Sequence, residues 1–151
     1  MGVPVGQRNV PDTPATERCY AVDACHALCL HVLKITANVK YFDFEHHADI
    51  VQHIRELAVT IYNCAYVANV QNVTKDPATW EVRKANQEAV VQGLNEMVAM
   101  VQVAKPLFHL RSRKTTYWLG LTLHAKDLSC AWHASDVRRY GVPVNHDIER
   151  V

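Results

Sequence analysis

The sequence is poor in glycine and has no long apolar run, and each absence excludes a class of protein. Only five of its 151 residues are glycine, which excludes a collagen-like or glycine-rich low-complexity chain. No run of about 18 residues is wholly apolar, so the sequence predicts no transmembrane helix. Its first residues, MGVPVGQRNV, lack the charged start and apolar stretch of a signal peptide. We therefore expect a cytoplasmic protein that does not enter a membrane.

Motifs that bind phosphate or activate a nucleophile are also missing. The sequence contains no G-x-x-x-x-G-K-[ST], G-x-G-x-x-G, H-E-x-x-H or G-x-S-x-G pattern. The nearest approach to a metal cluster is His46, Asp49 and His53, which share one helix face and can bind a divalent cation. The alternative, which we favour, is a polar outer face, where such residues usually lie. We expect no catalytic residues, no metal site and no cofactor.

The five cysteines, an odd number, argue against a disulfide scaffold. Two of them lie one helical turn apart, but no C-x-x-C pair supplies the usual spacing of a zinc site. In a helical chain cysteine more often packs as a small apolar side chain. We therefore expect all five to be core residues. They are Cys19, Cys25, Cys29, Cys64 and Cys130.

A strong apolar period of 3.6 residues runs through four segments of the chain. The stripe of the second segment consists of Ile50, Ile54, Leu57, Ile61, Cys64 and Ala68. This pattern predicts helices near residues 17–39, 44–72, 77–106 and 112–134. Asp43, Asp76 and Ser112 are the expected N-caps of the last three. Two glycines, Gly93 and Gly120, fall inside these helices. A close helix crossing or an interface would compensate for their cost, and the alternative is that either glycine is simply tolerated.

The expected fold class is all-α, an antiparallel up-down four-helix bundle, because connections this short make neighbouring helices antiparallel. The bundle is expected to cover residues 17–134. Residues 1–16 contain three prolines, and residues 135–151 contain a glycine and a proline. We interpret both flanks as flexible tails.

Charge is unevenly distributed along the chain, although the net charge is only +1. Residues 1–101 carry eight Lys or Arg against eleven Asp or Glu, whereas residues 102–139 carry seven against two. A basic segment in a nearly neutral chain indicates a localised anionic partner. The alternative is a solvated face whose counter-charges come from another helix.

Two segments resemble the accessory variability determinant proteins of diversity-generating retroelements. They are LCLHVLKITANVKYFDFEHHADIVQHIRELAVTIYNCAYVAN, residues 28–69, and AKPLFHLRSRKTTYWLGLTLHAKDLSCAWHAS, residues 104–135. The residues that carry the resemblance are Leu33, Thr36, Ile61, Tyr62, Ala68 and Asn69 in the first segment, and Leu110 and Trp132 in the second. Four-helix-bundle proteins encoded in ribosomal RNA intervening sequences share much of this pattern.

The resemblance implies a non-catalytic accessory subunit of mutagenic retrohoming. Such a subunit assembles as a homopentamer, binds the reverse transcriptase, and contacts the template RNA or the cDNA hybrid. Two alternatives are a stand-alone bundle of the intervening-sequence type and an adaptor that binds only protein.

Six cations are the expected nucleic-acid contacts under this interpretation. Arg111, Arg113 and Lys114 surround the expected start of the fourth helix, whose free backbone N–H groups favour phosphate. Lys126 extends this surface, and Arg138 and Arg139 lie on the expected C-terminal tail, where they can follow a strand or contact the polymerase.

Overall fold

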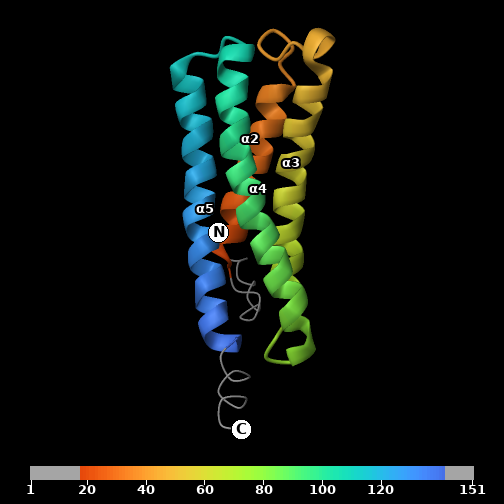
Figure 1. Ribbon diagram of the computed structural model, residues 1–151, viewed down its shortest axis with the longest axis vertical. Coiled ribbons are helices and arrows are strands. Elements are labelled where there is room, and N and C mark those ends of the chain that lie inside the picture. Colours follow the sequence, from red (N-terminus) through yellow and green to blue (C-terminus); the bar gives the residue numbers. More distant parts are fainter. Residues whose placement is uncertain (1–17, 142–151) are drawn as a thin grey trace, which may run out of the picture.

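The computed structural model describes residues 18–141, which form four long α-helices joined by short connections (Figure 1). The helices are α2 (Tyr20–Thr36), α3 (Phe44–Val70), α4 (Trp80–Leu107) and α5 (Ser112–Tyr140), with a 3₁₀ turn, η2 (Pro77–Thr79), before α4. No strand occurs in this part of the chain, so the predicted all-α bundle is confirmed. The expected N-terminal tail, residues 1–16, lies outside the described residues, as do residues 142–151. None of the described helices is long and apolar enough to cross a membrane.

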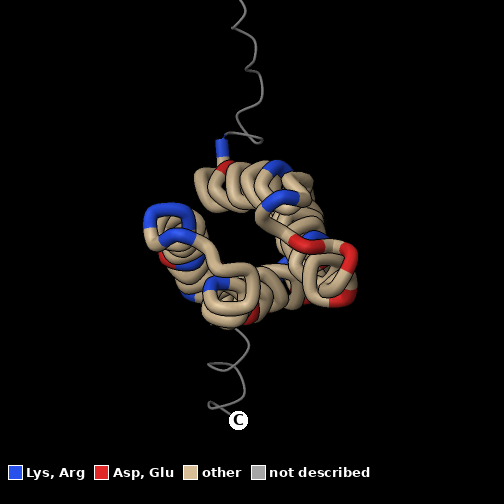
Figure 2. Tube along the Cα trace, turned by 90° about the horizontal axis from the view of Figure 1, so that it is seen from above, with Lys and Arg blue, Asp and Glu red and all other residues tan. Residues whose placement is uncertain are grey.

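Consecutive helices are antiparallel, and each packs against two neighbours in the order α2, α3, α4, α5 around the bundle (Figure 2). The α2–α3 and α4–α5 connections therefore lie at the same end (Figure 1). We call this the upper end; it comprises residues 31–49 and 105–118. The α3–α4 connection lies at the opposite, lower end, together with the last turns of α5. The topology thus brings together segments that are about 70 residues apart in the sequence.

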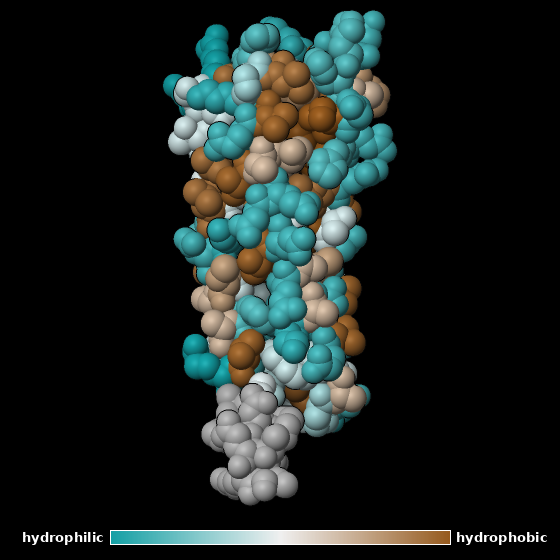
Figure 3. Space-filling view, in the orientation of Figure 1, coloured by the Kyte–Doolittle hydropathy of each residue, from teal (hydrophilic) through white to brown (hydrophobic). Residues whose placement is uncertain are grey.

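All four helices contribute to one apolar core, as their stripes predict. Each large aliphatic or aromatic side chain that is removed from water contributes about 1.5–3 kcal/mol to folding. The largest apolar side chains that are almost wholly buried are Leu28, Val32, Phe42, Val51, Ile54, Ile61, Val90, Leu94, Met97 and Trp118. The outer surface is more mixed: in Figure 3 apolar side chains are interspersed with polar ones, and their densest group on this face lies toward the upper end.

Of the three expected N-caps, Asp43 is confirmed for α3, and Asp76 caps η2 rather than α4, whose N-cap is Thr79. Asp43 accepts a hydrogen bond from the backbone N–H of His46, and Asp76 accepts one from Ala78 at the start of η2. The third is wrong, because Ser112 is already the first helical residue and Arg111 occupies the N-cap position. No side chain caps α5, and the Ser112 hydroxyl instead accepts a hydrogen bond from Lys105 Nζ at 3.0 Å.

The C-terminal boundary of the bundle also differs from the prediction, which ended the last helix at residue 134. Helix α5 continues to Tyr140, so residues 135–140 belong to the bundle rather than to a tail. The extension is held by polar and aromatic contacts with α4: Asp136 pairs with Arg83, and the Tyr140 ring lies 5.5 Å from that of Trp80. Arg138 and Arg139 are therefore on the last helical turn.

The two helix glycines have different surroundings. A Cβ atom on Gly93 would lie 2.8 Å from Cγ1 of Ile61, so this glycine marks a close crossing of α4 and α3, as expected. Gly120 has no neighbour within 4 Å of its Cβ position, and no close crossing explains it.

Candidate anion-binding site at the upper end

Six cations gather at the upper end of the bundle. They are Lys34, Lys40, Lys105, Arg111, Arg113 and Lys114. None of the six forms an ion pair with any residue of the described chain. The carboxylates of this end are Asp43, Glu45 and Asp49, at the start of α3. In Figure 2, which views this end, red gathers at the near end of α3, and blue lies at the near ends of the other three helices. The alternative considered above, a solvated face with counter-charges from another helix, receives no support from direct ion pairs of these six residues.

A pocket of about 430 Å³ opens between the end of α2 and the start of α5. Its apolar side chains are Ile35, Phe42, Leu110 and Trp118. Three further rings line it, those of His31, Tyr41 and Tyr117. Its remaining polar side chains are Lys34, Asn38, Arg113 and Lys114. No carboxylate lines it. The pocket therefore combines an apolar interior with three cations, which favours an anion that also carries an apolar or aromatic part.

The aromatic walls are held by contacts with their neighbours. Lys114 Nζ lies 4.5 Å from the centre of the Tyr41 ring, a cation–π distance. The rings of His31 and Tyr117 meet edge to face at 5.0 Å, yet Tyr117 stays 59 % exposed. Most of the Tyr117 ring is thus free to contact a ligand.

The electrostatics of the pocket favour negative charge. The first turn of α5 carries the positive end of the helix dipole, and no acidic residue lies there to offset it. Burial lowers the pKa of His31, and the charges of Lys114 and Lys34 lower it further. His31 is therefore neutral near pH 7, and the positive charge of the pocket comes from Lys34, Arg113 and Lys114.

One wall of the pocket carries an unmatched donor. Trp118 is 0 % exposed, and its Nε1 is the one buried side-chain nitrogen or oxygen in the described chain without a hydrogen-bond partner. An unpaired buried donor of this kind costs about 1–3 kcal/mol. Trp118 therefore leaves its one polar side-chain atom unsatisfied in a wall of the pocket.

The structure brings together only part of the predicted nucleic-acid surface. Arg113 and Lys114 line the pocket, and Arg111 is exposed beside them. Lys126 is half-buried and lies about 18 Å farther along α5 than Lys114, at 1.5 Å per residue. By the same measure Arg138 and Arg139 lie about 38 Å from Arg113, at the lower end. The six predicted contacts therefore do not form one continuous site.

Sequence reasoning missed the α2 side of the pocket, namely Lys34, Asn38 and Tyr41. The signal was present, since Lys34 falls in the last turn of the first helix. An up-down bundle places that turn beside the start of the fourth helix, so the predicted topology already brought the two basic segments together.

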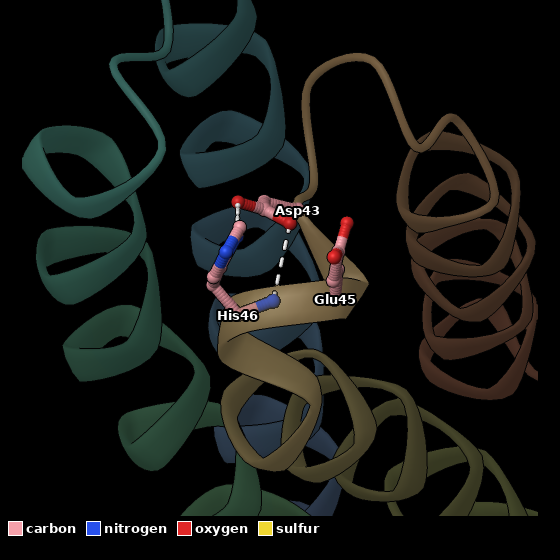
Figure 4. Close-up of side chains that lie close together, drawn as sticks. All are labelled: Asp43, Glu45 and His46. Carbon is pink, nitrogen blue, oxygen red and sulfur yellow. Dashed lines mark hydrogen bonds and ion pairs between the residues drawn. The ribbon is translucent and has the colours of Figure 1, made fainter.

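A second polar group, at the start of α3, consists of Asp43, Glu45 and His46, whose ligand atoms lie within 4.8 Å of one another (Figure 4). Both carboxylate oxygens of Asp43 are engaged with His46, one with its backbone N–H at 3.2 Å and the other with its ring Nδ1 at 2.7 Å. This hydrogen bonding to His46 lowers the pKa of Asp43. Helix capping accounts for the cluster. The expected polar face of His46, Asp49 and His53 is confirmed as exposed.

A buried polar network at the lower end has a structural role. Arg83 donates to Asp136 at 2.6 Å and to the backbone carbonyls of Ala68 and Gln71 at 3.2 and 3.1 Å. Gln87 donates to the same Asp136 oxygen at 2.8 Å. These bonds join the ends of α3 and α5 to the start of α4 and leave the guanidinium and carboxylate satisfied within the fold.

No protein-family model matches this chain, and no curated protein and no solved structure is significantly similar to it. The resemblance to the accessory variability determinant family therefore rests on the residues quoted above and stays a prediction.

Proposed function

We propose that the protein is a non-catalytic, cytoplasmic accessory subunit of a diversity-generating retroelement that binds RNA through the upper end of its bundle. In this role it holds the template RNA or the cDNA hybrid beside the reverse transcriptase. The observation that carries the proposal is the group of six cations without ion-pair partners in the described chain, gathered at one end of the bundle.

Phosphate binding explains why these cations stay unpaired. Each phosphate contact releases condensed counterions, so affinity grows with the number of cations that reach the backbone of the nucleic acid. The uncapped N–H groups at the start of α5 add donors of the same polarity. In a homopentamer, as the family resemblance implies, five upper ends would form a basic ring.

The test is co-purification of the full chain with the reverse transcriptase and template RNA of the retroelement. The variant carries Arg111→Glu, Arg113→Glu and Lys114→Glu, and the matched control carries Lys75→Glu, Lys84→Glu and Arg138→Glu. Both triples change the net charge by the same amount, but the control lies at the lower end. We expect the upper-end triple to lose RNA and the control to keep it, with unchanged helical circular dichroism in both.

Retention of RNA by the upper-end triple would overturn the proposed RNA contact. If the polymerase still bound while RNA retention did not depend on either triple, the protein-only adaptor would be the better description. Light scattering of the isolated chain tests the pentamer separately, because a monomer or dimer contradicts the oligomeric state that the resemblance implies.

A further inference from the structure

The pocket beside α5 is more than a patch of positive charge. Three cations border it, no carboxylate does, and its interior is made of apolar and aromatic side chains. Inorganic phosphate would satisfy the cations but leave the exposed ring of Tyr117 and the half-buried Ile35 facing water. An uncharged aromatic ligand would fill the interior but leave the cations unmatched. The pocket therefore favours one molecule that carries both a planar ring and a strong negative charge.

Nucleotides have this combination. Base stacking on tyrosine is tolerant of base identity, and Tyr41 and Tyr117 supply rings from opposite sides of the α2–α5 junction. Lysine and arginine form charge-assisted hydrogen bonds with phosphate. The pocket volume of about 430 Å³ falls within the range of sites that enclose ligands of nucleotide size.

We infer that this pocket binds a nucleotide, with the base against the rings of Tyr41 and Tyr117 and the phosphate beside Lys34, Arg113 and Lys114. The inference deepens the proposed function by naming the part of the ligand that enters the fold. An unpaired residue of single-stranded RNA and a free mononucleotide offer the same chemistry, and the experiment below separates these two sources.

The chain carries a built-in reporter of occupancy. Of its three tryptophans, only Trp118 lines the pocket, while Trp80 and Trp132 lie toward the lower end of the bundle. A base that enters the pocket changes the surroundings of one indole out of three. Binding is therefore expected to change the tryptophan fluorescence partly, and calorimetry gives the affinity independently of that signal.

The experiment titrates the full-length chain with AMP, UMP, adenosine and ribose 5-phosphate at one fixed ionic strength. We expect AMP and UMP to bind, and the two fragments to bind at least about tenfold more weakly, since each lacks either the phosphate or the base. A single-stranded decanucleotide is titrated in parallel. Tighter binding of the decanucleotide than of AMP identifies RNA as the source of the base, and equal affinity identifies a free nucleotide.

Two variants with matched controls test the assignment of residues. Tyr117→Ala is expected to weaken AMP binding about tenfold, whereas Tyr66→Ala, which removes a tyrosine of similar exposure on α3, leaves it unchanged. Lys114→Glu is expected to abolish binding, whereas Lys75→Glu, at the lower end, does not. All four positions are exposed, so circular dichroism should show each variant folded.

Equal affinity for ribose 5-phosphate and AMP would overturn the inference, because the pocket would then read only phosphate. Unchanged AMP binding by Tyr117→Ala would overturn it as well. Either result is compatible with loss of RNA in the upper-end triple, so the pocket can fail while the proposed function stands. In the reverse case AMP binds, but the upper-end triple retains as much RNA as the unmutated chain. That result would contradict the proposed function and leave the nucleotide pocket supported.

Discussion

Asp136 is only 2 % exposed, and two side chains of another helix stabilise its buried carboxylate. Arg83 and Gln87 of α4 both donate to its Oδ2. A buried charge is tolerated only when it is paired and hydrogen-bonded. Removal of one partner leaves the other charge buried and unpaired, and this lowers the free energy of unfolding. The last turns of α5 therefore depend on this polar contact as well as on the aromatic contact between Tyr140 and Trp80.

Asp136→Ala should lower the free energy of unfolding by about 3–5 kcal/mol, because it leaves the Arg83 guanidinium buried without its counter-charge. Asp127→Ala is the matched control, since Asp127 is an exposed carboxylate on the same helix without an ion pair in the described chain. Its effect should stay within about 0.5 kcal/mol. Urea unfolding followed by circular dichroism measures both, and equal midpoints would show that the buried pair contributes little.

Helices α4 and α5 each contain an interior glycine, and a side chain added at the two positions would meet different surroundings. At the crossing of α4 over α3 the absence of a side chain matters, because a Cβ atom on Gly93 would lie 2.8 Å from Cγ1 of the buried Ile61. Around Gly120 the space is open, so only the intrinsic helix propensity of glycine acts there.

Gly120→Ala should therefore stabilise the protein by up to about 1 kcal/mol, which is the difference in helix propensity between the two residues. Gly93→Ala gains the same propensity but forces its Cβ against Ile61, an overpacking that typically costs about 1–3 kcal/mol. The net effect at Gly93 should be destabilising. Thermal unfolding of the two variants side by side is the measurement, and a common rise in Tm would contradict the close crossing.

The helices were predictable because their cores are apolar stripes, and a stripe is a local property of the sequence. The extension of α5 beyond residue 134 was not predictable in this way. It depends on Asp136 and Arg83, which are 53 residues apart and do not belong to any apolar pattern. Ser112 failed as an N-cap for a related reason, since its hydroxyl is engaged by Lys105 of the preceding helix.

For the whole molecule, the main asymmetry is between its two ends. At the lower end Arg83, Lys84 and Arg139 have ion pairs and Lys75 and Arg138 have none, whereas all six cations of the upper end are unpaired in the described chain. Unpaired like charges repel one another, so the folded state is expected to gain stability from any anion that binds among them. Binding to the folded state alone stabilises it by mass action.

Phosphate at low millimolar concentration should raise the Tm of the protein more than sodium chloride of the same ionic strength. At ten times its Kd, a single bound phosphate would contribute about 1.4 kcal/mol, which corresponds to about 4 °C for a chain of this size. Scanning calorimetry gives the shift. The Arg111→Glu, Arg113→Glu, Lys114→Glu variant should lose it and the lower-end triple should keep it; an equal shift in all three would point to a general salt effect.

Only one side of the candidate site, the start of α5, was predictable from the sequence. Arg113 and Lys114 stand out as cations at an expected helix start, and both line the pocket. Tyr41 and Asn38 carry no such signal, because their role arises only when the α2–α3 connection packs beside α5. Arg138 and Arg139 show the opposite error: they are close to the basic segment in the sequence, but a straight helix carries them to the other end.

Helix α5 runs without interruption from the pocket to the lower end, so a distance measured by spectroscopy along it indicates a position in the bundle. Of the five cysteines expected in the core, Cys25 and Cys29 are buried, Cys19 and Cys64 are half-buried, and Cys130 is exposed, so the expectation was wrong for Cys130. Burial raises the pKa of Cys25 to about 11 and suppresses its reactivity. A dye attached to Cys130 would sit about 24 Å along the helix axis from Lys114. Resonance energy transfer from that dye to a fluorescent nucleotide would report the distance between the dye and the bound nucleotide. That distance shows at which end of the bundle the nucleotide binds.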